Sequence, residues 1–332
     1  MPDPSLWVLI AIIVLALGFG IVNGFNDAAN AIATVIGTRT LSPRNAIIMA
    51  AFFNLAGAAT GTAVAKTIGK GILIPEAISY QTVVAALAAV IVWTSFATYR
   101  GLPVSLTHGF VAAMAAAGVA AVGTGAVAWG VMGKILSAVV TAPILGFIGG
   151  FAFMILLLWI FRRSIPAKIR NIFSNMQILS SAFMAYSHGK NDGQMPIGII
   201  TMAFVLYTGQ TAMWDSIPWW IILISALSIS MGTTVGGRRV IKTLGMRVTT
   251  LRPVHGFAAE ASAASVIEVA SHLGIPVSTT HCISSAVMGV GTTRRLSAVR
   301  WGVAGNIITA WIVTFPVCGG LGYLFSWLLG LF

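Results

Sequence analysis

The chain has 332 residues, of which 58% are hydrophobic and 8% are charged, and its formal net charge is +12. A soluble globular domain carries about 25% charged residues, so this composition excludes that class and predicts an all-α polytopic membrane protein. The excess of Lys and Arg is explained by basic loops on the cytoplasmic side of a cell membrane, without nucleic-acid binding.

Apolar runs long enough to enter a bilayer follow one another along the chain. The expected spans are residues 5–23, 45–65, 80–98, 135–161, 173–187, 196–209, 219–236, 254–272 and 302–329. Three shorter stretches rich in Gly, Ala and Ser lie between them, near residues 27–37, 104–123 and 277–291. They are too polar or too short for simple spans, so they predict broken or re-entrant helices.

A basic segment near the middle of the chain divides it into two units. Residues 162–172 carry Arg and Lys but no acid, which predicts a cytoplasmic linker by the positive-inside rule. On either side of it we expect a first repeat, residues 1–161, and a second repeat, residues 173–332.

Two motifs recur in the same order on both sides of this linker. Pro103–His108 recurs as Pro276–His281, and Gly24–Asp27 recurs as Gly189–Asp192, which indicates a duplicated unit. Duplicated polar motifs inside membrane segments are typical of secondary transporters, whose sites lie at the interface of the repeats. An odd number of crossings in each repeat would invert the second and bring the two aspartates together, but the sequence leaves this number open.

The motif Pro-Val-Ser-x-Thr-His predicts a helix that begins inside the membrane. Ser105 and Ser278 are the expected N-caps, and Thr107 and Thr280 fall in the first turns. The free N–H groups and the dipole of a helix N-terminus attract an anion, and hydroxyls add donors. Two such termini suit a tetrahedral oxyanion without a buried Arg or Lys.

The Asn-Asp motif predicts a cation site. Asn23, Asn26, Asp27 and Asn30 lie within one and a half helical turns, and their oxygens are hard ligands. A monovalent ion fits better than calcium, because a single carboxylate provides little charge to hold a divalent ion.

The second copy keeps only part of this pattern. Asn191 and Asp192 are present, Met195 replaces the third Asn, and we expect Gln194 to turn towards the substrate.

The segments GFNDAANAIATVIGTRTLSP, SHGKNDGQMPIG and IPVSTTHC resemble the signatures of the inorganic phosphate transporter (PiT) family. The resemblance implies a cation-coupled symporter of inorganic phosphate, not an enzyme, with no cofactor and with about twelve membrane segments in two inverted repeats. It implies a multi-pass protein of the inner or plasma membrane and leaves a homodimer open. The sodium ligands implied are Asn26, Asp27, Asn30, Asn191 and Asp192, and the phosphate contacts implied are Ser105, Thr107, Ser278, Thr279, Thr280 and Gln194.

Further polar residues are secondary candidates for the site. Some relatives have a glutamate where this chain has Asn54, whereas the related glutamate of the second half is kept as Glu260. The secondary candidates are Asn23, Asn54, His108, Glu260 and His281. His108 and His281 are expected either to donate to phosphate or relay protons, or to pack with hydrogen bonds to the backbone.

Two charged side chains are expected to lie outside the site. We expect Lys190 to extend to the membrane interface, and Glu268 to pair with His272 one turn further along the helix.

The sequence favours sodium-coupled phosphate import and leaves alternatives open. The coupling ion is sodium or, alternatively, a proton, and a metal–phosphate complex is a further option within the family. Sulfate is the competing anion, and a passive anion channel or a phosphoesterase is a weaker interpretation.

Overall fold

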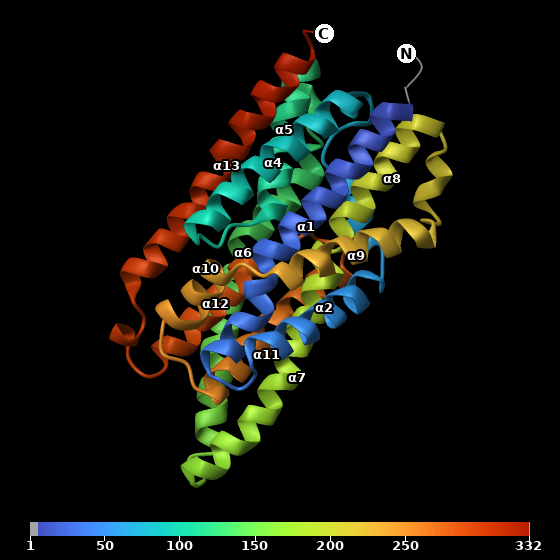
Figure 1. Ribbon diagram of the computed structural model, residues 1–332. Coiled ribbons are helices and arrows are strands. Elements are labelled where there is room, and N and C mark those ends of the chain that lie inside the picture. The colour runs from blue at the N-terminus through green and yellow to red at the C-terminus, as the bar shows by residue number, and fades with distance from the viewer. Residues whose placement is uncertain (1–5, 332) are drawn as a thin grey trace.

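The computed structural model describes residues 6–331, apart from the side chain of Ala28, and this part of the chain folds into an elongated bundle of helices (Figure 1). The expectations for residues 1–5, the first residue of the predicted span 5–23 among them, lie outside the described residues. The helices are α1 (Leu6–Gly37), α2 (Pro43–Ala58), α3 (Ala63–Lys70), α4 (Tyr80–Arg100), α5 (Leu106–Val122), α6 (Trp129–Ile160), α7 (Pro166–Asp192), α8 (Gln194–Thr208), α9 (Trp219–Val235), α10 (Arg238–Lys242), α11 (Pro253–His272), α12 (Thr279–Thr292) and α13 (Trp301–Leu329). Short 3-10 or π turns occur at η1 (Pro75–Ala77), η2 (Thr124–Ala126), η3 (Thr211–Trp214), η4 (Thr243–Arg247) and η5 (Leu296–Ala298).

Long apolar helices make this an integral membrane protein. Within the described residues, α1, α4, α6 and α13 are each long and apolar enough to cross a bilayer. Two further candidates are bent pairs: α2 and α3 meet at 73°, and α9 meets the segment Arg238–Arg247 at 64°.

Two of the predicted segments are wrong. Residues 45–65 are not one continuous helix, because the helix breaks before α3, where Gly61 adopts a φ of +132° that side-chain-bearing residues rarely adopt. Residues 27–37 are not a separate broken helix but the last part of α1, which runs without a break from Leu6 to Gly37.

The predicted starts and serine caps of α5 and α12, hereafter the half-helices, are confirmed. The side chain of Ser105 caps α5 by accepting a hydrogen bond from the backbone N–H of His108 at 3.2 Å. Ser278 caps α12 in the same way, with a distance of 3.1 Å to the N–H of His281. Proline disfavours helix in the residue before it and serine caps the first turn, which sets where each helix begins. Ser105 and Ser278 are both buried, so both helices start within the bundle.

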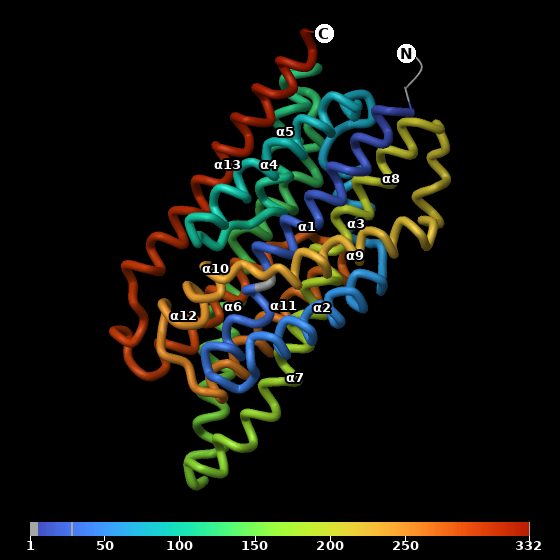
Figure 2. The backbone as a smooth tube through the Cα atoms, viewed as in Figure 1, coloured from blue at the N-terminus to red at the C-terminus, as the bar shows by residue number. Residues whose placement is uncertain are grey.

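The helices that carry the Asn-Asp motifs cross their neighbours at very short range. A Cβ on Gly24 of α1 would lie 2.0 Å from the carbonyl oxygen of Ile229 in α9, and a Cβ on Gly189 of α7 would lie 2.2 Å from the carbonyl oxygen of Asn54 in α2. Glycine lets helix backbones touch in lipid, where packing replaces the hydrophobic effect. Figure 2 shows α1 running beside α9 although the two are far apart in sequence.

Helices from the two halves of the chain pack against each other, notably in four pairs. Helix α1 packs on α9 as α7 packs on α2, and α5 packs on α13 as α12 packs on α6. Hydrogen bonds from Thr107 and Thr279 to Asp192 and from Thr280 to Asp27 place the first turns of α5 and α12 beside α1 and the end of α7.

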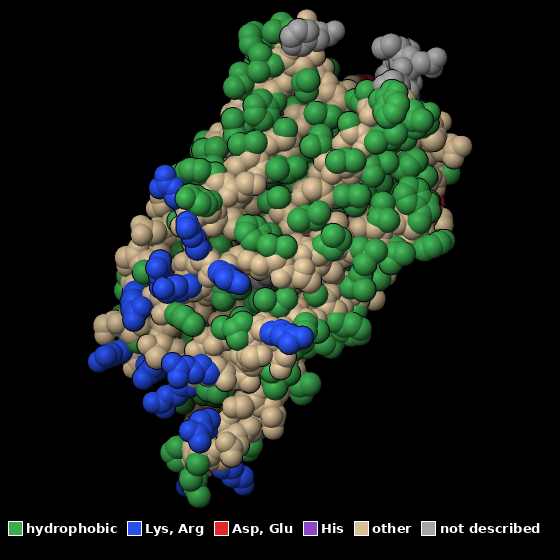
Figure 3. Space-filling view, in the orientation of Figure 1, with side chains coloured by type: hydrophobic (Ala, Val, Ile, Leu, Met, Phe, Trp, Pro, Cys, Tyr) green, Lys and Arg blue, Asp and Glu red, His purple; other side chains and the backbone are tan. Residues whose placement is uncertain are grey.

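The basic segment at residues 162–172 is only partly a loop. Helix α7 begins at Pro166, so Lys168 and Arg170 lie on its first turns. Proline is favoured at this position because its missing N–H would have no partner inside the helix. On the face shown in Figure 3, Lys and Arg side chains gather over one part of the molecule, around its lower end. The positive-inside rule predicts that this end faces the cytoplasm.

Candidate functional site

Three ionisable side chains meet where α1 passes the end of α7. The carboxylates of Asp27 and Asp192 are both buried, and His188 lies between them one turn before Asp192. Its Nε2 is 3.2 Å from Oδ2 of Asp192 and 3.9 Å from Oδ2 of Asp27. One ligand atom from each of the three residues lies within 4.8 Å of the others, so a positive ion placed among them would touch all three.

Hydroxyl groups from both half-helices point at these carboxylates. Thr280 of α12 donates a hydrogen bond to Oδ1 of Asp27 at 2.9 Å, and Thr279 donates to Oδ2 of Asp192 at the same distance. Thr107 of α5 donates to Oδ1 of Asp192 at 3.4 Å. The structure thus brings together the two motif types that the sequence placed more than 70 residues apart.

Three asparagines of the motifs, Asn26, Asn30 and Asn191, donate through their amide N–H groups and keep their oxygens free. Asn30 donates to the hydroxyls of Thr279 and Thr280 at 3.1 and 2.9 Å, and Asn191 donates to the carbonyl of Val277 at 3.1 Å. Asn26 donates to Thr98 in α4. The Oδ1 atoms of four motif asparagines are buried and, within the described residues, have no hydrogen-bond partner: Asn23, Asn26, Asn30 and Asn191.

This donor set fits a hard cation. A buried acceptor without a partner costs about 1–3 kcal/mol, so unpaired amide oxygens beside two carboxylates favour the binding of a positive ion. Carboxylate and amide oxygens are the ligands that hard cations prefer. Asn23, a secondary candidate in the sequence, shares this feature with the predicted ligands.

Gln194 begins α8 directly beyond the Asp192 carboxylate. Its Oε1 accepts hydrogen bonds from the backbone N–H groups of Val64 at 2.9 Å and Ala65 at 3.2 Å, at the start of α3. The side chain therefore ties the break between α2 and α3 to the site. Only its NH₂ group is left to contact a substrate.

His188 is the site residue that the sequence reasoning missed. Its Nδ1 lies 2.8 Å from Oδ1 of Asn54, whose amide in turn donates to the hydroxyl of Thr233 at 3.0 Å. The secondary candidate Asn54 thus orients the imidazole. The available signal was the repeat itself, because His188 precedes Gly189 as Asn23 precedes Gly24.

Glu260 is buried in a different place, on α11. Its carboxylate accepts hydrogen bonds from Thr34, from Ser180 and, at 3.3 Å, from Nε2 of Gln177. It shares none of these partners with Asp27 or Asp192. The two halves are therefore not equivalent: Asn54 belongs to the central cluster, whereas Glu260 has its own set of donors.

The two motif histidines contact each other instead of the backbone. The rings of His108 and His281 are 4.7 Å apart in an edge-to-face arrangement. His108 stacks on Phe315 at 5.4 Å and His281 stacks on Trp311 at 3.9 Å, both in α13. No hydrogen bond to their ring nitrogens occurs within the described residues, so the expected backbone-bonded arrangement is not found.

Lys190 does not extend to the membrane interface. It forms an ion pair with Glu268 of α11, and its side chain is 14% exposed. This pair replaces the predicted one between Glu268 and His272. The prediction failed because the i, i+4 spacing says nothing about a partner on a neighbouring helix.

Broken helices whose ends meet buried carboxylates and hydroxyls between two packed halves are the architecture of membrane transporters. Residues 23–322 match the model of the phosphate transporter family, and the chain belongs to this family. Its members are transporters rather than enzymes.

Sequence relatives cover almost the entire chain. It is 40% identical to the "Probable low-affinity inorganic phosphate transporter" of Bacillus subtilis (strain 168) over 331 residues, which is 99% of each protein. It is 39% identical to the protein of the same name from Rhizobium meliloti (strain 1021), over 93% of this chain and 92% of that one.

A solved structure shares the fold. This structure, described as "The sodium-dependent phosphate transporter", is 29% identical in sequence, with a TM-score of 0.91 over 98% of this chain and 100% of that one.

Proposed function

We propose that this protein imports inorganic phosphate together with sodium by alternating access. The observation that carries the proposal is the placement of hydroxyls from two half-helix N-termini directly on two buried carboxylates. The N-termini attract an anion, and the carboxylates with the free amide oxygens attract cations. The likeness to a solved transporter that is described as sodium-dependent supports sodium as the cation.

The mechanism follows from the charges of the empty and filled site. Without cations, Asp27 and Asp192 repel phosphate and occupy the hydroxyls of Thr279 and Thr280. Sodium ions on the carboxylates and on the asparagine oxygens remove this repulsion. The hydroxyls can then turn to the phosphate oxygens, so cation and anion bind only together.

We assign the ligands as the motifs suggest. Ser105 and Ser278 accept backbone N–H bonds through their oxygens, which leaves each hydroxyl hydrogen for an anion. The proposed phosphate contacts are Ser105, Thr107, Ser278, Thr279, Thr280 and the NH₂ group of Gln194. The proposed sodium ligands are Asn26, Asp27, Asn30, Asn191 and Asp192.

We also propose that the halves are inverted repeats with about twelve membrane segments. The four helix pairs between the halves and the two bent pairs, one in each half, support this assignment. In alternating access, one half would then move against the other around the fixed site, and the two halves would exchange conformations. The location in the plasma membrane and a homodimer stay predictions.

Replacement of sodium tests the coupling. Uptake of radiolabelled phosphate into proteoliposomes should fall to the level of protein-free liposomes when external sodium is replaced by choline at fixed pH. The membrane potential is held constant with potassium and valinomycin. Unchanged uptake would refute sodium coupling, and a response to an imposed proton gradient would identify the proton as the coupling ion.

A second candidate is symport of a divalent metal–phosphate complex. It is favoured by His188, because two carboxylates and an imidazole within 4.8 Å form a ligand set that a transition metal prefers to sodium. In this case His188→Asn, which introduces the residue that the first motif has at Asn23, should lower metal-stimulated uptake by at least about 10-fold. Sodium-driven uptake measured without divalent ions should persist, and equal loss of both would contradict a metal-specific role.

A further inference from the structure

A cavity of about 700 Å³ lies where α6, α7 and α11 meet, near the basic segment at residues 162–172. Most of its wall is apolar, and this wall comes from Met154, Leu158, Pro166, Ile169 and Val254. Three arginines line the same cavity, namely Arg170, Arg252 and Arg294. The cavity thus combines a large apolar surface with concentrated positive charge.

No carboxylate of the described residues lines this cavity. Within residues 6–331, the pair of Lys190 with Glu268 is the only ion pair formed by a Lys or Arg side chain. It does not line this cavity. The three guanidinium groups therefore have no acidic partner. The first turns of α7 and α11, which begin at Pro166 and Pro253, also border the cavity and add the positive ends of their dipoles.

We infer from the residues around it that the cavity lies at the level of the bilayer surface. Trp159, near the end of α6, has a 63% exposed side chain, and the guanidinium of Arg162 lies 5.4 Å from its ring. Aromatic and basic residues together mark the membrane interface. Leu158 lines the cavity and is also 47% exposed on the outside of α6, so the apolar wall is continuous with the surface that faces lipid.

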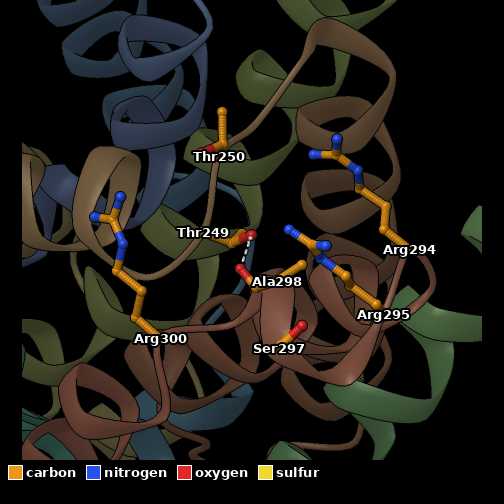
Figure 4. A pocket seen from close by; sticks show the side chains of 7 residues that line it. All are labelled: Thr249, Thr250, Arg294, Arg295, Ser297, Ala298 and Arg300. Carbon is orange, nitrogen blue, oxygen red and sulfur yellow. Dashed lines mark hydrogen bonds between the residues drawn. The ribbon is translucent and has the colours of Figure 1, made fainter.

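A second cavity of about 630 Å³ shares Arg294 with the first and is polar. Figure 4 shows the guanidinium groups of Arg294, Arg295 and Arg300 around it, with the hydroxyl of Thr249 bonded to the carbonyl of Ala298 at 2.9 Å. It provides room for negatively charged groups next to the apolar cavity.

We propose that the apolar cavity binds an anionic phospholipid of the cytoplasmic leaflet. Its phosphate lies among Arg170, Arg252 and Arg294, and an acyl chain follows the apolar wall past Leu158. Free phosphate would leave this wall unused, and a lipid without net charge would bring no net negative charge to the three arginines. The bound lipid ties α7, which carries Asp192, to α11 at their cytoplasmic ends.

Lipid retention by the full-length protein tests this proposal. The protein is purified in mild detergent, incubated with phosphatidylglycerol or phosphatidylcholine, and examined by native mass spectrometry. We expect at least one phosphatidylglycerol to be retained in preference to phosphatidylcholine. R170Q and R294Q should each lower its affinity about 5-fold, because a basic residue near the membrane surface contributes about that factor.

Two further variants separate this site from general attraction to basic surfaces. R163Q changes an exposed arginine of the same end that does not line the cavity, and it should retain the lipid. Ile169→Trp fills the apolar wall while leaving every arginine in place, and it should lose the lipid. Retention by Ile169→Trp, or equal loss in R163Q, would overturn the proposal.

A soluble competitor distinguishes the source of the phosphate group. Inorganic phosphate and glycerol 3-phosphate at millimolar concentration should not displace phosphatidylglycerol from the wild-type protein. Displacement by either would show a site for free phosphate compounds and would also overturn the proposal.

Discussion

Asp27→Asn and Asp192→Asn are each expected to lower sodium-driven phosphate uptake by at least about 100-fold. Each change keeps the shape of the side chain and its ability to accept from Thr280 or Thr279, but it removes a buried charge. Loss of one partner from a buried charged pair costs about 3–5 kcal/mol, and each 1.4 kcal/mol is a factor of 10 in affinity. Uptake into proteoliposomes and sodium affinity measured by calorimetry are the two readouts.

Asp215→Asn is the matched control, because the same substitution is made at an exposed position outside the cluster. Its uptake and sodium affinity should equal those of the wild type. Wild-type sodium affinity in both Asp27→Asn and Asp192→Asn would show that neither carboxylate holds the cation. Reduced uptake with unchanged thermal stability would separate an effect on the site from loss of the fold.

Gly24→Ala should destabilise the protein by about 3 kcal/mol, at the upper end of the effects of overpacking. The added Cβ would lie 2.0 Å from the carbonyl oxygen of Ile229 and 2.8 Å from the backbone N of Thr233, so α1 and α9 must move apart. A backbone atom cannot move aside as a flexible side chain can. Thermal unfolding in detergent, followed by size-exclusion fluorescence, should show a lower midpoint and a smaller yield of folded protein.

Gly18→Ala in the same helix is the control for this prediction. A Cβ at this position meets nothing within 4 Å, and alanine is the better helix former, so the variant should be as stable as the wild type. Similar unfolding of the two variants would contradict the close crossing of α1 and α9.

Several features of the fold could be predicted because their causes are local. Proline followed by serine fixes where α5 and α12 begin, since the ring of proline and the serine cap act on neighbouring residues. The broken span at residues 45–65 was missed because its apolar composition is that of a continuous helix. The break depends on the positive φ of Gly61 and on the packing around it, which hydropathy does not register.

The site shows the same division between local and distant effects. Thr107, Thr279 and Thr280 lie at helix starts that the motifs locate, and the structure places them on the two aspartates. The ion pair of Lys190 with Glu268 and the bonding of His188 to Asn54 could not be read from spacing, because each joins two different helices.

The sequence by itself determined that the chain is a membrane protein, that its polar motifs are duplicated, and which residue types carry the proposed chemistry. These properties depend on composition and on neighbours along the chain. Only the tertiary structure decided that Asp27, His188 and Asp192 form one cluster and that Glu260 lies apart from it. The physical reason is that glycine contacts between backbones, such as that of Gly24 with α9, set how the helices cross, and this crossing fixes which side chains meet.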